Sequence, residues 1–275
     1  MMSFRQSISR IKAVILYVIL FVFLIPFLLV VMNSFKKTQQ FVENPLSIPG
    51  NIHFENYTAA FTNMKFMQGL SNSIFITVAA VFIIVIFSSM TGYLFVRYKW
   101  KLNTVLFFMM LGSMALPFQV IMIPLVMLYG KLGLLNMKGT LLFLYLGFGV
   151  PFGVFTFHGF IKGIPYELEE SAFIEGSSRL RTFFQIVLPL LKPVFVTLIV
   201  LNVLWIWNDY LLPSLVLLSP EQRTLPLSTF TFFSSYTVDY APLMAGLIMT
   251  VIPVLVLYLF VQNQIIKGIT EGALK

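Results

Sequence analysis

Long apolar runs separated by short polar stretches dominate the pattern along the chain. A helix needs about 20 mostly apolar residues to cross the hydrocarbon core of a bilayer, and six runs reach that length. These runs cover residues 13–32, 70–96, 102–128, 140–160, 188–218 and 242–262. They lack the alternation of a membrane barrel strand, and an unclosed strand would leave backbone groups unpaired in lipid. The pattern therefore predicts an all-α membrane protein with six transmembrane helices.

Composition supports the same class of protein. Hydrophobic residues make up 59% of the 275 positions and charged residues only 10%, against roughly 25% charged in soluble domains. The net charge of +8 comes from small basic groups between the apolar runs, which is typical of membrane topology and not of nucleic-acid binding. The absence of cysteine excludes disulfides, thiolate metal sites and a cysteine nucleophile, and two histidines are too few for a histidine-rich metal site.

The basic residues also predict an orientation. Most of them lie before the first run, after the second, after the fourth, or after the sixth. This group contains Arg5, Arg10, Lys12, Arg97, Lys99, Lys101, Lys162, Arg179, Arg181, Lys192, Lys267 and Lys275. By the positive-inside rule these ends are cytoplasmic, so both termini are predicted to lie inside the cell. The first run is interpreted as an uncleaved anchor, because it is long and no small-residue cleavage site follows it.

The cytoplasmic connection at 161–189 is the most informative. Pro165 suits the first position of a helix, and an acidic first turn of Glu167, Glu169 and Glu170 suits the helix dipole. Gly176 suits a left-handed turn that ends this helix, and Ser177 could cap a successor. Apolar residues then recur with helical spacing at Leu180, Phe183, Phe184 and Val187. We predict a helix, a glycine turn and an amphipathic helix.

Small side chains on this connection favour a contact with another protein. Ser171, Ala172 and Gly176 would let a partner backbone approach closely. The alternative is a solvated loop helix whose acids only aid solubility. Periodicity by itself leaves both interpretations open.

The spacing of this connection resembles a known signature. Glu170-Ser171-Ala172, then Gly176, then Ile186-x-Leu188-Pro189 is similar to the EAA motif of permease subunits of binding-protein-dependent ABC importers. Serine at 171 replaces the usual alanine, and glutamate at 175 replaces the usual aspartate, so size or charge is kept. The segments at 71–73, 207–210 and 268–275 resemble the carbohydrate branch of these permeases, the maltose and multiple-sugar type.

The resemblance implies a type I ABC importer permease in the cell membrane of a prokaryote. It implies an anchor helix and long extracellular loop at 1–69, and a permease core at 70–275 with the EAA loop at 161–189. The implied partners are a homologous second permease, two ATP-binding-cassette subunits and an extracytoplasmic sugar-binding protein. ATP and Mg would be bound by the partner ATPase, with no cofactor in this chain. The expected ATPase-coupling residues are Glu167, Glu170, Ser171, Ala172, Gly176, Leu188 and Pro189.

The chain also lacks the glycine-rich phosphate loop that an ATPase would need, so we expect no enzyme activity in it. A rival hypothesis is a self-contained, ion-coupled secondary transporter that uses His158 or Asp209. A membrane-embedded enzyme would need paired polar groups within the spans, and Asp209 is the only acid there.

Two further sets of residues are candidates for function. A polar and aromatic sugar path is predicted at Asn202, Trp205, Asn208, Asp209 and Tyr210; the alternative is an interfacial aromatic belt. The outer segment 233–240 is predicted to contact the binding protein through Tyr236, Asp239 and Tyr240; the alternative is a solvated turn. The glycine pairs Gly149/Gly153 and Gly159/Gly163 are expected to mark close helix packing.

Overall fold

The computed structural model describes residues 2–233 and 237–273, and its regular elements within that part of the chain are all helical. The elements are α1 Met2–Ser34, α2 Thr38–Glu43, α3 Glu55–Asn63, α4 Phe66–Arg97, α5 Lys101–Met114, α6 Phe118–Lys131, α7 Lys138–Ile161, α8 Glu167–Ile174, α9 Arg179–Thr182, the π-helix η1 Phe183–Val187, α10 Leu188–Leu190, α11 Lys192–Asn208, α12 Leu211–Val216, α13 Leu225–Ser228, the 3₁₀-helix η2 Thr229–Phe232 and α14 Tyr240–Ala273. Two compact units divide the chain. One contains Met1–Met67 and Ser228–Pro253, and the other contains Gln68–Leu227 and Val254–Lys275.

Four helices in the described residues are long and apolar enough to cross a membrane by themselves, within α1, α4, α7 and α14. Two bent pairs reach the same length together. The α5–α6 pair bends by 102°, and the pair formed by Arg179–Leu190 and Lys192–Asn208 bends by 78°. The all-α prediction is therefore confirmed, with four to six candidate spans. The runs at 102–128 and 188–218 are each helical but bent, so the count of six spans holds only if each bent pair crosses the membrane as one.

Proline explains where the two long runs break. Pro117 is the N-cap of α6 and has extended backbone, and the residue before a proline is disfavoured in the α conformation. Pro193 lies in the first turn of α11, where its missing N–H leaves no helical bond unmade. In the run at 188–218, the helix also ends before the apolar run does, because Asp209 has extended backbone after Asn208.

In the larger unit, the core lies where α4, α7 and α11 meet, with Ile84, Phe157 and Leu198 almost wholly buried. Two glycines on α7 allow α4 to approach. A Cβ at Gly149 would lie 2.6 Å from Ile84 Cδ1, and one at Gly153 would overlap the side chain of Ser88. The prediction of close packing at this pair is confirmed.

The second glycine pair behaves differently. A Cβ at Gly159 would meet nothing within 4 Å, and one at Gly163 would meet only Phe160 O of its own turn. The packing prediction for this pair is wrong for contacts within the described residues, because α4 packs on the neighbouring Phe157 and His158 and not on Gly159.

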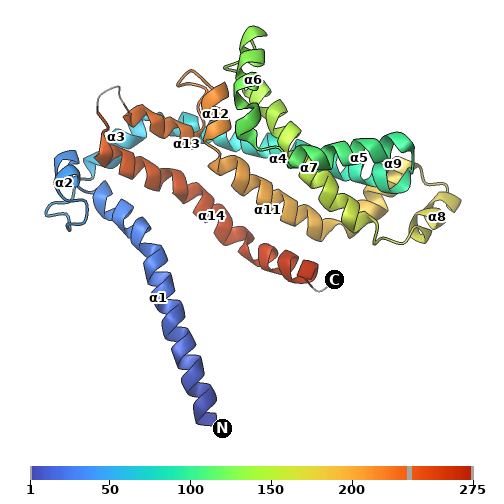
Figure 1. Cartoon of the computed structure of the whole chain (residues 1–275), viewed down its shortest axis with the longest axis horizontal. Helices are drawn as coiled ribbons and strands as arrows, with labels where there is room; N and C mark the ends of the chain where they lie inside the picture. Colours follow the sequence, from blue (N-terminus) through green and yellow to red (C-terminus); the bar gives the residue numbers. More distant parts are fainter. Residues whose placement is uncertain (1, 234–236, 274–275) are drawn as a thin grey trace. The chain divides into compact units, whose positions relative to one another are not determined.

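In the smaller unit, α1 is a long helix whose C-terminal end lies near α2 and α3 (Figure 1). From Lys12 to Met32 this helix has no buried residue, whereas Asn33 and Ser34 at its C-terminal end are buried. The segment after α1 is held by amide and ammonium groups: Asn56 Nδ2 donates to Ser34 O and Lys36 O, and the buried Lys36 Nζ donates to Asn44 O and Pro45 O at 3.1 Å. Burial lowers the pKa of Lys36 below its ordinary value.

Candidate functional site

The helix α8 forms the first part of the connection after α7. It begins at Glu167, two residues later than the sequence predicts from Pro165, and its first turn carries all three acids. It ends through Gly176, which has φ +83°. Gly176 N–H donates to Phe173 O at 3.0 Å, and Ser177 N–H donates to Ala172 O at 2.9 Å. The left-handed turn predicted at Gly176 is confirmed.

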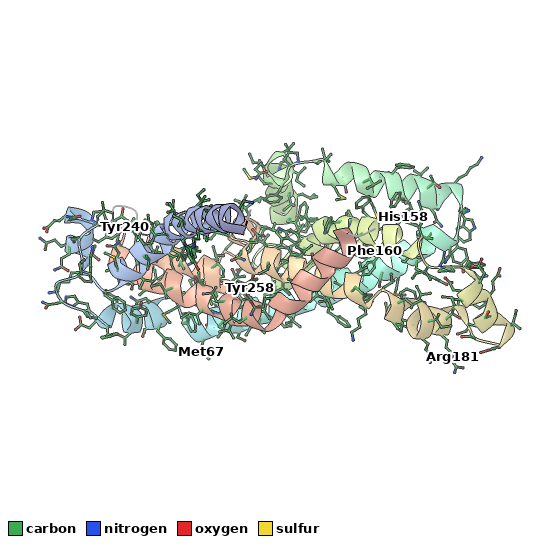
Figure 2. All side chains as sticks on the ribbon, turned by 90° about the horizontal axis from the view of Figure 1, so that it is seen from below. Met67, His158, Phe160, Arg181, Tyr240 and Tyr258 are labelled. Carbon is green, nitrogen blue, oxygen red and sulfur yellow. The ribbon has the colours of Figure 1, made fainter. Side chains whose placement is uncertain are left out.

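The stretch after the turn departs from the predicted amphipathic helix. Ser178 and not Ser177 is the N-cap of α9, and it accepts from Arg181 N. Helix α9 then widens into the π-helix η1, which changes the angular spacing of its side chains. Phe183 and Val187 are therefore buried, whereas Leu180 is 63% exposed and Phe184 is 45% exposed. Arg181 lies on this stretch (Figure 2).

Two faces of α8 differ in chemistry. The outward face is exposed and follows the helical repeat i, i+3, i+4 and i+7. It consists of Glu167, Glu170, Ser171 and Ile174. Ile174 is 87% exposed, and sequence reasoning missed it. Ala172, which we expected on this surface, is buried on the opposite side of the helix.

The inward face is built around Glu169, whose side chain has no exposed area. Arg97 Nε donates to Glu169 Oε1 at 2.7 Å, and the Tyr93 hydroxyl donates to Oε2 at 2.6 Å. Arg97 Nη2 also donates to Ile164 O at 3.0 Å, and its guanidinium lies over the Tyr166 ring. The sequence interpretation grouped Glu169 with the acids of the first turn; the structure instead pairs it with α4.

Leu188 and Pro189 lie in α10, at the bend before α11. Leu188 is partly buried against the core of the larger unit, and Pro189 is exposed. They therefore belong to the bend and do not extend the outward face of α8.

The predicted sugar path occupies the end of α11 and the residues after it. Asn202 is buried, and its amide donates to Leu198 O at 2.8 Å. Trp205, Asn208 and Tyr210 are exposed. Asn202 is thus separated from the exposed members of the set.

Asp209 is held by neighbouring elements. Its Oδ2 accepts from the Tyr145 hydroxyl at 3.0 Å, and its Oδ1 accepts from the backbone N–H groups of Leu211 and Leu212. Tyr145 also contacts the Trp205 ring edge to face, with centroids 5.5 Å apart. Asp209 therefore joins α7 to the start of α12.

Of the three residues predicted on the outer segment, Tyr236 lies outside the described residues. Asp239 Oδ1 accepts from Thr38 Oγ1 at 2.7 Å, and the Tyr240 ring stacks on Phe41 with centroids 4.7 Å apart. Both residues are therefore engaged with α2 in the same unit, a connection that the sequence did not reveal.

The segment at 71–73 gains a structural role. Asn72 Nδ2 donates to Glu221 O and Arg223 O at 2.9 Å, and Asn72 Oδ1 accepts from Lys138 Nζ at 2.6 Å. Ser73 Oγ accepts from Leu225 N at 2.7 Å. These two side chains attach the start of α4 to the segment before α13 and to the first residue of α13.

His158 lies near the end of α7, as does Phe160 (Figure 2). Its ring stacks on Phe107 of α5, with centroids 4.1 Å apart. Within the described residues, no group of three or more histidine, cysteine, aspartate or glutamate side chains could hold a metal ion.

Comparison with known proteins places these features in a wider group. A family model described as binding-protein-dependent transport system inner membrane component matches residues 84–270. The chain is 45% identical over 250 residues to the probable starch degradation products transport system permease protein AmyC of Thermoanaerobacterium thermosulfurigenes, covering 91% of each chain. It is 35% identical to the multiple sugar-binding transport system permease protein MsmG of Streptococcus mutans, covering 92% of each.

A solved structure has the same fold. It is a crystal structure of a bacterial ABC transporter involved in the import of the acidic polysaccharide alginate, and one of its chains matches with a TM-score of 0.79. The match covers 94% of this chain and 96% of that chain at 22% identity.

Proposed function

This chain belongs to the family of binding-protein-dependent transport system inner membrane components, and we propose that it forms one half of the pathway through which an ABC importer admits an oligosaccharide. As a permease subunit it is an integral membrane protein and not an enzyme. The ion-coupled alternative is not favoured, because the curated relatives are permeases of binding-protein-dependent systems.

The observation that carries the proposal is the outward face of α8. A short helix that exposes Glu167, Glu170, Ser171 and an isoleucine beside a left-handed glycine offers a compact surface to a second protein. Ile174 is 87% exposed, and covering this apolar side chain with such a partner would be energetically favourable. We assign this surface to the ATP-binding-cassette subunit, which would bind ATP and Mg.

The proposed assembly contains a second, homologous permease, two ATP-binding-cassette subunits and an extracytoplasmic sugar-binding protein. The bent helix pairs count as spans in this proposal, giving six crossings with both termini in the cytoplasm. Single cysteines at Ser7 and Thr270 are then expected to resist a membrane-impermeant thiol reagent in intact cells, whereas one at Asn51 reacts. Labelling of the first two would contradict this topology.

The proposed cargo is a neutral oligosaccharide, with glucose oligomers first, since the 45% identical relative is named for starch degradation products. Trp205, Asn208 and Tyr210 supply exposed rings and an amide at one end of α11, which suits stacking and hydrogen bonding to sugars. Tyr236, Asp239 and Tyr240 are proposed to lie near the binding protein.

Substitution of Gly176 tests the docking role. Gly176→Arg places a long cation beside the outward face and forces a non-glycine residue to φ +83°. We expect it to reduce co-purification of the ATPase and ATP-driven uptake. Gly133→Arg is the matched control, because Gly133 has φ +66° and also has open space at its Cβ. Normal uptake and assembly with Gly176→Arg would remove α8 as the docking element.

Uptake by the reconstituted complex tests the cargo and the energy source. Proteoliposomes with ATP inside and the binding protein outside are offered maltotriose, raffinose or diacetylchitobiose. We expect ATP-dependent uptake that is strongest for maltotriose and insensitive to a protonophore. Uptake that a protonophore abolishes without ATP would support the ion-coupled alternative instead.

A further inference from the structure

The attachment of α8 to the rest of the larger unit rests on few groups. Only Glu169 and Ala172 of α8 are buried, and the backbone of α8 packs closely with α9 and η1. The contact between α8 and α4 is made by long side chains, because Arg97 and Tyr93 of α4 both donate hydrogen bonds to the Glu169 carboxylate. A force applied to the outward face of α8 therefore has a direct route into α4 through one carboxylate.

Both residues from α4 make a second contact on the same connection. Arg97 donates to Ile164 O, just before α8, and its guanidinium lies over Tyr166. The Tyr93 ring lies 5.1 Å from that of Phe183, which follows α9. The last turns of α4 therefore hold both sides of the glycine turn, and α8 cannot shift without changing these contacts.

Stability alone gives little reason for a buried ion pair here. Removing two charges from water is expensive, and well-packed apolar residues of similar volume are often equally stable or more so. Charge-assisted hydrogen bonds do provide a directional and stiff connection, because they are short and are lost steeply with displacement.

We propose that Tyr93, Arg97 and Glu169 form a mechanical link that transmits movement of α8 into the transmembrane helix α4. The link rests on the proposed docking of the ATPase to α8 and adds the path by which that docking reaches the membrane. Glu170, the neighbouring acid, is exposed and does not belong to the link. Tyr93, Arg97 and Glu169 act as positioning residues and contact no sugar in this mechanism.

The test uses the complete complex in proteoliposomes, with maltotriose or, if the parent complex prefers it, raffinose. Glu169→Gln keeps the shape of the side chain and removes its charge. Because the charge-assisted contact with Arg97 is lost, we expect sugar uptake per ATP hydrolysed to fall about tenfold or more. The ATPase is expected to co-purify as with the parent, which separates this result from the assembly defect expected for Gly176→Arg.

Tyr93→Phe is the milder variant and removes one hydroxyl from the link. We expect a smaller drop, of about threefold, in uptake per ATP, because Arg97 Nε still donates to Glu169 after the hydroxyl is lost. Tyr258→Phe is the matched control, because Tyr258 is 45% exposed on α14 and lies outside the link.

A cysteine pair distinguishes a mechanical link from a purely structural ion pair. The chain has no cysteine, so Arg97→Cys/Glu169→Cys introduces the only thiols on it. A reducible bifunctional thiol reagent is expected to restore uptake per ATP, and reduction is expected to abolish it again. Each single cysteine variant controls for reaction with partner subunits.

Three outcomes would overturn the link. Glu169→Gln could keep the parent ratio of uptake to ATP hydrolysis, or it could lose the ATPase altogether. The cross-linked pair could also stay uncoupled in an assembled complex. Failure of Gly176→Arg to disturb assembly would instead contradict docking at α8 and leave the contact between Glu169 and α4 to be explained by another partner.

Discussion

The two ends of α4 are attached to the chain by different chemistry. At its N-terminal end, Asn72 bonds to carbonyl groups between α12 and α13, and Ser73 accepts from the N–H of Leu225, the first residue of α13. At its C-terminal end, Arg97 and Tyr93 converge on the buried Glu169 carboxylate. One end thus relies mainly on neutral groups and backbone carbonyls, whereas the other relies on a buried pair of charges.

The difference lies in what remains when one partner is removed. An amide that loses one of several bonds leaves backbone carbonyls that can find water near the surface. A buried carboxylate that loses its arginine remains as an uncompensated charge. The C-terminal attachment is therefore more sensitive to single substitutions, which suits a place where a movement must be passed on.

The largest effect is expected from Arg97→Leu. It leaves Glu169, whose side chain has no exposed area, without its counter-charge, and such a change destabilises by about 3–5 kcal/mol. Thermal unfolding of the purified full-length chain in detergent measures the loss. The double variant Arg97→Leu/Glu169→Leu is expected to recover most of the stability but not the coupling. Equal stability of the single variant and the parent would show that the carboxylate is not held by this charge.

A smaller effect is expected midway along α4, where it packs on α7. Gly153→Ala forces its new methyl group into the Ser88 side chain, and overpacking of this kind destabilises by about 1–3 kcal/mol. Gly159→Ala has open space and is expected to change the unfolding temperature little. Similar shifts for both variants would mean that backbone entropy and not the contact between the two helices controls the effect.

Much of the fold follows from the sequence because the bilayer demands helices of a set length. Apolar runs therefore located α1, α4, α7 and α14 without any tertiary information. The breaks in the third and fifth runs depend on the backbone angles of a few residues. A proline in the sequence does not by itself determine whether the helix breaks there. Pro117 and Pro193 lie at breaks, whereas Pro26 and Pro151 lie inside helices.

The candidate site was predicted less completely. Gly176 was identified from its residue type, because a left-handed backbone strongly favours glycine. The division of α8 into two faces was not, because an acid on a short helix carries no sign of whether it points to solvent or to a partner. Glu169 and Glu170 are adjacent glutamates with opposite environments, and only the position of Arg97 in space separates them.

The smallest of the three stability effects is expected at the N-terminal end of α4. Asn72→Ala removes two donors to Glu221 O and Arg223 O and the acceptor for Lys138 Nζ. We expect a loss of about 1–2 kcal/mol, because hydrogen bonds contribute about 0.5–1.5 kcal/mol each and part of the loss is recovered by water.

A local measurement sharpens this last comparison. Since Asn72 ties down the carbonyl of Arg223, the variant is expected to be cleaved faster by trypsin at that residue, while Gly176 and α8 keep their parent behaviour. Gln68→Ala is the matched control, because Gln68 is exposed and makes one bond, to Glu221 O at 3.1 Å. If Asn72→Ala and Gln68→Ala were cleaved at the same rate, the neutral network would not hold this segment. The contrast between the two ends of α4 would then reduce to the buried charges alone.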